Sequence, residues 1–371
     1  MQKFIKKNTI FLIPIGLVFI FPITVFIISR EYYSAKDSVE NQILHTEAIF
    51  EPSYVNLNKT YKKLLVDSIN PDILVLGTSR SGQYRKDFFS NNIVFANASN
   101  VIDSIAEMEK FVKELSTKSR VKLMIIGLDQ DIFFIDTPKP DEVSVLERWR
   151  TLLVSNWHKV YEDYYYEKFS IKNLYKQSKE TSNIGMNALI NGRGFRGDGS
   201  FRDGKKLNAL NRESLLSIDI SNELSAIKAD RGSFLYGKEI RRSDLDTLRR
   251  ILKLCKERSI YVVGFMPPYP HAFYEAMSHV DDIYKKQVFG LPNTVQNIFG
   301  EFDFGFFDFS DIKMLGASDV EFSDIKHGTD KLYLRMIIYM AERDSKLGEY
   351  TDLSKLKKML EDSENVFLKN Q

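Results

Sequence analysis

Apolar runs that each end at a glycine most constrain the fold of this chain. The run DILVL, Asp72 to Leu76, is followed by Gly77, and Leu123 to Ile126 is followed by Gly127. Runs without polar alternation are typical of parallel strands covered on both faces. Between them, Ile102 to Leu115 carries apolar residues at helical spacing. Alternating strands and helices predict an α/β fold built on a doubly wound parallel sheet.

Further elements continue this rhythm. The short apolar run Ile93 to Phe95 predicts another strand, and Ile260 to Phe265 predicts one that ends before two prolines. Leu245 to Cys255 predicts the helix before the latter strand. The amphipathic stretch Leu353 to Leu368 predicts a closing helix. With 371 residues, the chain is long enough for one large domain or two smaller ones.

The N-terminal region holds an apolar run from Thr9 to Ile28, with no charged residue between Lys7 and Arg30. About 20 apolar residues are needed for a helix to cross a bilayer. A cleavable signal peptide is the alternative, but the run is long for one and no A-x-A-like cleavage site follows. We therefore expect an uncleaved transmembrane anchor over residues 9–29.

Charge indicates the orientation of this anchor. Lys3, Lys6 and Lys7 precede the apolar run, whereas positive and negative residues are mixed after it, so residues 1–8 should stay in the cytoplasm and the main domain should face outward. The chain has 52 Lys and Arg against 50 Asp and Glu, which lacks the cationic surplus of a nucleic-acid-binding protein.

Two regions fit the strand and helix rhythm poorly. Residues 30–70 are polar with scattered apolar positions and predict a stalk and a lead-in helix. Residues 140–240 predict an inserted cap or long loop, in which the aromatic residues of 157–175 either pack in a core or stack on sugars. The glycine-rich run Asn191 to Lys206 is typical of a surface loop. Alternatively, three of its arginines bind an anionic substrate: Arg193, Arg196 and Arg202.

Two short motifs could carry chemistry. The first strand is followed by Gly-Thr-Ser-Arg-Ser, residues 77–81, and ligands of open α/β sheets bind outside the carboxyl ends of the strands. Near the other end of the chain, Asp324 and His327 are three residues apart, which lets the carboxylate and the imidazole form a hydrogen bond. A serine beside that imidazole would complete a nucleophile, a base and an orienting acid.

These motifs resemble those of the SGNH, or GDSL-like, hydrolases, whose fold is flavodoxin-like. The layout is similar to that of membrane-anchored members in bacterial envelope systems, such as the teichoic acid D-alanine transfer and alginate acetylation proteins. The matching residues are ILVLGTSRS, residues 73–81, and DIKH, residues 324–327. The resemblance implies Ser79 as nucleophile, His327 as general base and Asp324 as its partner. It implies an SGNH-like domain over 71–345, followed by residues 346–371.

The chain departs from the family pattern at the oxyanion hole. The second family block supplies a glycine N–H, but the corresponding segment Phe95 to Asn100 contains no glycine. The third block offers an asparagine amide, whereas this chain has Asp129, and an ionised carboxylate cannot donate a hydrogen bond. The candidates for oxyanion or substrate binding, beside the Ser79 N–H, are Asn97, Ser99, Asn100, Asp129 and, on a loop near the same edge, His271.

The expected activity is serine-dependent transfer or hydrolysis of O-acyl groups on a bacterial cell-surface polysaccharide. The chain would sit in the inner membrane with its main domain periplasmic or extracellular, next to its glycan and to a membrane acyl-export protein. No cofactor or metal is expected, because Cys255 is the single cysteine and no H-E-x-x-H motif is present. Ser81 is the alternative nucleophile. The alternative functions are a non-catalytic glycan-binding or assembly factor and a lipase or thioesterase.

Overall fold

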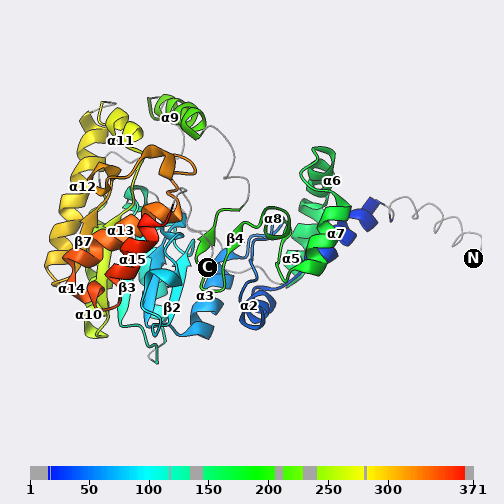
Figure 1. The fold of residues 1–371 in the computed structure, drawn as a ribbon, viewed down its shortest axis with the longest axis horizontal. Coiled ribbons are helices and arrows are strands. Elements are labelled where there is room, and N and C mark those ends of the chain that lie inside the picture. The colour runs from blue at the N-terminus through cyan, green and yellow to red at the C-terminus, as the bar shows by residue number, and fades with distance from the viewer. Residues whose placement is uncertain are drawn as a thin grey trace, which may run out of the picture. The chain divides into compact units, whose positions relative to one another are not determined.

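The computed structural model describes residues 16, 18–116, 118–133, 145–204, 212–228, 240–279 and 282–363. They divide into two compact units. Unit 1 takes its residues from 1–64, 140–197 and 202–206, and unit 2 takes the rest. Figure 1 labels the strands β2, β3 and β7 of unit 2 and shows helices around them.

A five-stranded, wholly parallel sheet forms the centre of unit 2. Its strand order is β2-β1-β3-β6-β7. The five strands are β1 (Ile73–Gly77), β2 (Phe95–Ser99), β3 (Leu123–Gly127), β6 (Tyr261–Met266) and β7 (Gly305–Asp308). The chain passes from β1 to β2 on one side and then to β3 on the other, so the strand order reverses between β1 and β3. In open α/β sheets, ligands bind at the carboxyl end of such a switch point.

Helices pack on both faces of this sheet. On one face, alternate strand residues such as Leu74, Met124 and Val262 contact the apolar sides of α4 (Ile105–Glu114), α10 (Arg242–Glu257) and α12 (Asp282–Gly300). On the other, Ile73, Ile125 and Val263 contact α13 (Asp330–Arg343) and α15 (Leu353–Glu361). The remaining helices of unit 2 are η1 (Ser79–Ser81), η2 (Lys86–Phe88), η3 (Gln130–Phe133), α9 (Arg212–Lys228), α11 (His271–Met277), η6 (Ile312–Leu315), η7 (Asp319–Glu321) and α14 (Ser345–Gly348).

Most predicted elements of unit 2 are present with shifted bounds. The α/β class and the parallel sheet are confirmed. β2 begins where the predicted strand Ile93 to Phe95 ends, so the segment Phe95 to Asn100, matched to a family turn, is mostly strand. The strand β7 was not predicted from the sequence. The closing helix ends at Glu361, and the rest of its predicted length extends beyond residue 363, outside the described residues.

Unit 1 joins two regions that the sequence analysis treated separately. Its elements are α2 (Ala35–Leu44), α5 (Val145–Arg150), the π-helix η4 (Thr151–Ser155), α6 (Trp157–Tyr165), α7 (Ile171–Glu180), α8 (Met186–Asn191) and the short strand β4 (Gly194–Phe195). Helix α3 (Asn58–Ile69) precedes β1, and β5 (Phe201–Arg202) lies within the glycine-rich run. The expected stalk is wrong for the part in this unit: Phe50 exchanges two backbone hydrogen bonds of 2.9 Å with Phe195.

Arg30 shows how firmly the N-terminal part belongs to this unit. Its guanidinium donates to the carbonyls of Thr181, Asn183 and Ser178 at 3.2, 2.5 and 2.9 Å, at and just beyond the end of α7. A cation at a helix C-terminus is favoured by both the free carbonyls and the helix dipole. Residues 30–64 and the first part of the expected insertion therefore fold together.

The predicted anchor falls partly outside the described residues, since 1–15 and 17 are among those left out. Residues 18–28 are helical, and Val25 and Phe26 are fully buried. Within the residues that the structure describes, no helix has both the length and the apolar character needed to span a bilayer.

Candidate active site

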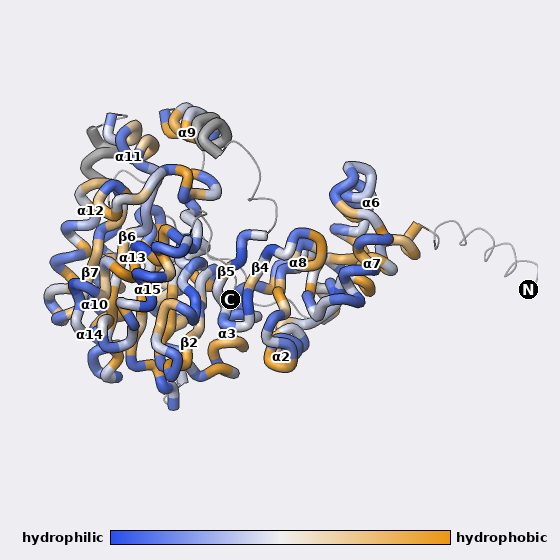
Figure 2. Tube along the Cα trace, in the orientation of Figure 1, coloured by the Kyte–Doolittle hydropathy of each residue, from blue (hydrophilic) through white to orange (hydrophobic). Residues whose placement is uncertain are grey.

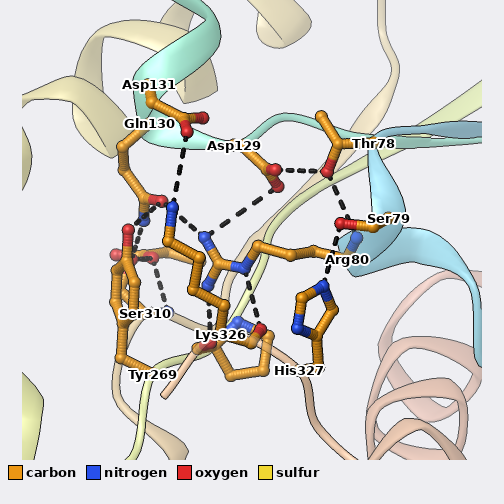
Figure 3. A network of polar contacts seen from close by, with 12 residues as sticks. Thr78, Ser79, Arg80, Asp129, Gln130, Asp131, Tyr269, Ser310, Lys326 and His327 are labelled. Carbon is orange, nitrogen blue, oxygen red and sulfur yellow. Dashed lines mark hydrogen bonds and ion pairs between the residues drawn. The ribbon is translucent and has the colours of Figure 1, made fainter. Parts of the chain in front are cut away.

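Ser79, His327 and Asp324 lie together at the carboxyl edge of the sheet. The His327 Nε2 atom is 2.9 Å from the Ser79 hydroxyl, and its Nδ1 atom is 2.9 Å from both carboxylate oxygens of Asp324. Figure 3 shows the imidazole facing Ser79. Because a carboxylate only accepts hydrogen bonds, Nδ1 carries the proton and Nε2 accepts from the serine. This is the geometry that nucleophile activation requires.

Ser79 is exposed because it lies on the turn directly after β1. It is the first residue of η1, where helical N–H groups have no partner within the helix. The Thr78 hydroxyl caps this turn by accepting from the Arg80 N–H at 3.2 Å. The Ser79 N–H makes no hydrogen bond within the described residues, so it is available to a ligand.

Asp324 is held by the loop that also carries His327. Its Oδ1 atom accepts from the backbone N–H groups of Lys326 and His327, both at 2.8 Å. An antiparallel bridge between Phe322 and Gly328 closes the loop just before α13. Burial opposes ionisation of Asp324, but the hydrogen bond and charge of His327 outweigh it and lower the pKa of the carboxyl group. Asp324 is therefore ionised at neutral pH.

Ser81, the alternative nucleophile, is fully buried. Its hydroxyl is packed against the last residues of two strands: a Cβ added at Gly77 or Gly127 would lie 2.1 Å from the Ser81 oxygen. The hydroxyl has no hydrogen-bond partner within the part of the chain that the structure describes. A substrate cannot reach it in this arrangement, which contradicts the alternative assignment.

The candidates on β2 are divided by the structure. Asn97 is buried, and its amide donates to the carbonyls of Ser81, Gly82 and Tyr84 while its oxygen accepts from the Ser99 N–H. It stabilises the loop after Ser79, where its amide protons are already used. Ser99 is fully buried as well. Asn100 is partly exposed, has a left-handed backbone with φ of 66°, and follows Ser99, the register partner of Gly77.

Asp129 contacts two residues of the turn that carries Ser79. One of its oxygens accepts from the Thr78 hydroxyl, and the other is 4.0 Å from the Arg80 guanidinium. The carboxylate therefore supports the turn that carries Ser79. His271 is also held elsewhere: its Nδ1 atom is 3.0 Å from Asp311, and none of its contacts within the described residues involves the triad.

Arg80, which the sequence analysis left without a role, connects the loops around the site. It donates to the carbonyls of Lys326 and Pro268 at 3.1 and 2.6 Å and to Gln130 at 3.3 Å (Figure 3). Its guanidinium lies 4.3 Å from the Tyr269 ring centre. Arg80 is 4% exposed, so its planar guanidinium group makes these hydrogen bonds while almost fully buried.

A second charged pair lies behind the His327 loop. Lys326 Nζ is 3.9 Å from Asp131. Burial and the neighbouring charge of Asp129 raise the pKa of Asp131 to about 6, and burial lowers the pKa of Lys326. Both shifts have desolvation as their largest cause.

A pocket of about 320 Å³ opens next to the triad. Residues of α9 and of the His327 loop line it: Asp219, Asn222, Glu223, Asp324, Ile325, Lys326 and His327. The apolar side of α9, with Ile220, Leu224 and Ile227, packs on Tyr269 and Ile325. This helix lies inside the expected insertion and was not predicted from the sequence, although the spacing of its three apolar residues is helical.

The alternative in which arginines of the glycine-rich run bind an anionic substrate stays a prediction. Arg193 lies 3.8 Å from Glu51 within unit 1. No group of residues that could hold a metal ion is found in the part of the chain that the structure describes. Comparisons with protein-family models, with curated proteins and with solved structures found no match to this chain. Function is therefore inferred from its own residues and their geometry.

Proposed function

We propose that the protein is a membrane-anchored serine acyltransferase or esterase of the SGNH type that acts on O-acyl groups of a bacterial surface polysaccharide. The observation that carries the proposal is the 2.9 Å contact between the exposed Ser79 hydroxyl and His327 Nε2, with Asp324 on the opposite ring nitrogen. The position at the switch point between β1 and β3 supports it, since ligands bind there.

The reaction proceeds in two steps. Ser79 Oγ attacks the ester carbonyl while its proton moves to His327 Nε2, and the leaving oxygen then takes that proton as the acyl–oxygen bond breaks. Water or a sugar hydroxyl next gives its proton to Nε2 and attacks the acyl-enzyme, which restores the Ser79 hydroxyl. Asp324 holds the imidazole in one tautomer and stabilises its protonated form.

The oxyanion forms next to the Ser79 N–H in this mechanism. Asn100 is the second donor, since it follows β2 at the level of the nucleophile turn. Neither Asn97 nor Asp129 contributes a side-chain donor, and one missing donor costs such enzymes about 10² to 10³ in rate. We therefore expect a slow enzyme on small esters.

The same shortage of donors favours one other function, a tethered protein that binds glycan or an assembly partner without catalysis. In that case, the triad residues are retained but turnover is absent. The two functions differ in whether Ser79 forms a covalent acyl intermediate.

The test is release of p-nitrophenol from its acetate by the detergent-solubilised full chain. Full-length protein is needed because Val25 and Phe26 are buried in unit 1 and Arg30 binds the end of α7. We expect Ser79→Ala, His327→Ala and Asp324→Asn each to lower kcat by at least about 10³-fold.

Ser81→Ala is the matched control, since it removes a buried hydroxyl from the same turn. A fluorophosphonate should label Ser79 in the native chain and in this control. Equal hydrolysis by the native, Ser79→Ala and His327→Ala proteins, without labelling, would exclude the enzyme and leave the binding function. Supplying acetylated glycan and an acyl donor in turn then separates esterase from transferase.

A further inference from the structure

Unit 1 leaves several aromatic and apolar side chains fully or partly exposed. Tyr165 and Tyr166 are 79% and 69% exposed, and Leu146 and Val154 are 80% and 65% exposed. We call them, together with Trp157, Tyr161 and Tyr164, the aromatic collar; all seven come from the consecutive elements α5, η4 and α6 and the residue after them. Single exposed apolar residues are ordinary, but a group of them on consecutive elements is typical of a contact surface.

The collar contacts the described end of the apolar N-terminal run. The ring centres of Phe19 and Trp157 are 5.2 Å apart, and Phe21 lies 5.1 and 5.2 Å from Tyr161 and Tyr164. The Tyr161 hydroxyl donates to the Val18 carbonyl at 2.7 Å. Figure 2 shows the apolar colour of this helix next to α6 and α7. In the same helix, Ile20 and Ile27 remain 56% and 54% exposed.

The length of the apolar N-terminal run indicates which partner covers the collar. A helix needs about 20 apolar residues to cross the hydrocarbon core, and the uncharged run from Thr9 to Ile28 supplies no more than that. Its last residues, 18–28, are also part of unit 1, where Val25 and Phe26 are fully buried. Residues 18–28 can belong both to a membrane-spanning run and to unit 1 only when the surface of unit 1 around Phe19 and Phe21 lies at the membrane.

We infer that the aromatic collar is a membrane-docking surface that inserts into the interfacial layer of the lipid bilayer. Tyr and Trp favour this layer because their rings are apolar while their O–H and N–H groups stay hydrated. Interfacial helices are typically buried about 5–10 Å into the headgroup region, which would cover the side chains of the collar. The inference rests on the proposed membrane anchor and is independent of the triad.

The chain provides its own probe for this surface. It has two tryptophans, Trp149 and Trp157, and both belong to unit 1. In Trp149→Phe, the remaining fluorescence comes from Trp157 in the collar. The full chain with this change is reconstituted into phosphatidylcholine and phosphatidylglycerol vesicles, with and without lipids brominated high on the acyl chain. We expect at least twofold quenching by the bromines and little quenching by aqueous iodide.

Two further variants test whether the collar itself makes the contact. The pair Tyr165→Ser and Tyr166→Ser should reduce bromine quenching of Trp157 at least by half. Tyr175→Ser on α7, which removes a 54% exposed tyrosine outside the collar, should not. Ser79→Ala should lose ester hydrolysis with unchanged quenching, so the proposed catalysis and this surface can fail separately.

Three results would overturn the inference. If carbonate strips the chain from the vesicles, the anchor on which it depends is absent. Strong iodide quenching of Trp157 in a chain that resists carbonate would mean that the collar faces water. Protection from both iodide and bromine would mean that protein, such as a second copy of the chain, covers it.

Discussion

At the residue scale, the arrangement of Ser79, His327 and Asp324 depends on the hydrogen bonds of these residues and of the polar residues around them. The Asp-x-x-His spacing was readable from the sequence because its hydrogen bond is local. The position of Ser79 was readable because parallel strands end at one edge. The role of Asn97 was not, since its amide binds three carbonyls of a loop that lies 13 to 16 residues earlier in the chain. Nothing in the local pattern around Asn97 indicates that contact.

Ser81→Ala provides a prediction at this scale. The Ser81 hydroxyl is buried without a partner among the described residues, and an unpaired buried hydroxyl opposes folding. We expect the free energy of unfolding to stay the same or rise by about 1 kcal/mol. The hydrolysis rate should stay within twofold. Urea unfolding and the p-nitrophenyl acetate assay measure the two, and a tenfold loss of activity would return Ser81 to the catalytic candidates.

At the element scale, the ends of β1 and β3 lack side chains where the nucleophile turn crosses them. A Cβ at Gly127 would lie 2.1 Å from the Ser81 oxygen and 3.0 Å from the Phe265 ring. The apolar runs ending in glycine predicted these strands, but the reason for the glycines is the close approach of η1. Sequence alone could not supply that reason, because it depends on a three-dimensional crossing.

Gly127→Ala should therefore displace the Ser79 turn. We expect the free energy of unfolding to fall by about 1 to 3 kcal/mol and kcat to fall at least about tenfold. Combining it with Ser81→Ala removes the nearest atom and should recover part of both losses.

Gly264→Ala is the control for that pair. Its Cβ would lie 2.3 Å from the Phe299 ring, on the opposite face of the sheet, so Ser81→Ala should not rescue it. If both glycine variants respond equally to Ser81→Ala, the crossing at Gly127 is not the cause.

Helix α7 offers a second prediction at this scale. Arg30→Ala removes three hydrogen bonds to carbonyls at the end of α7 and should lower the stability of unit 1 by about 2 kcal/mol. Arg30→Lys keeps the charge but loses the planar fork, so we expect an intermediate value. Urea unfolding followed by tryptophan fluorescence reports on this unit, because both tryptophans belong to it. An Arg30→Ala midpoint equal to the native one would contradict the capping role.

At the scale of the whole molecule, the sheet could be predicted, but the set of segments that form unit 1 could not. Its segments have no strict alternation, and their contacts join residues about 150 positions apart, such as Arg30 and Ser178. Glu31 lies at the centre of these contacts. Its carboxyl group accepts backbone N–H groups of Ser53, Tyr54 and Met186, yet burial raises its pKa to about 7.

This pKa predicts the pH dependence of unfolding. Folded Glu31 keeps its proton up to about pH 7, whereas in the unfolded chain its carboxyl group has its ordinary pKa of 4.5. Between these values the folded state binds more protons, so its stabilisation is complete below pH 4.5 and decreases as the pH rises through 7, by about 3 kcal/mol in total. Tryptophan-monitored urea midpoints at pH 5 and pH 8 should show this loss.

Glu31→Gln is the control, because an amide does not titrate. We expect its midpoint to change much less between pH 5 and pH 8. If the urea midpoint of Glu31→Gln changes with pH as much as that of the native protein, another group causes the effect.

The 248 positions between Ser79 and His327 have a consequence for biosynthesis. In the proposed function, the nucleophile Ser79 is translated early and its base His327 late, so a nascent or prematurely terminated chain that stops before His327 carries the serine without its activator. Under that proposal, such a chain forms no acyl-enzyme. The order of the two motifs thus delays the proposed chemistry until nearly the whole domain has been synthesised.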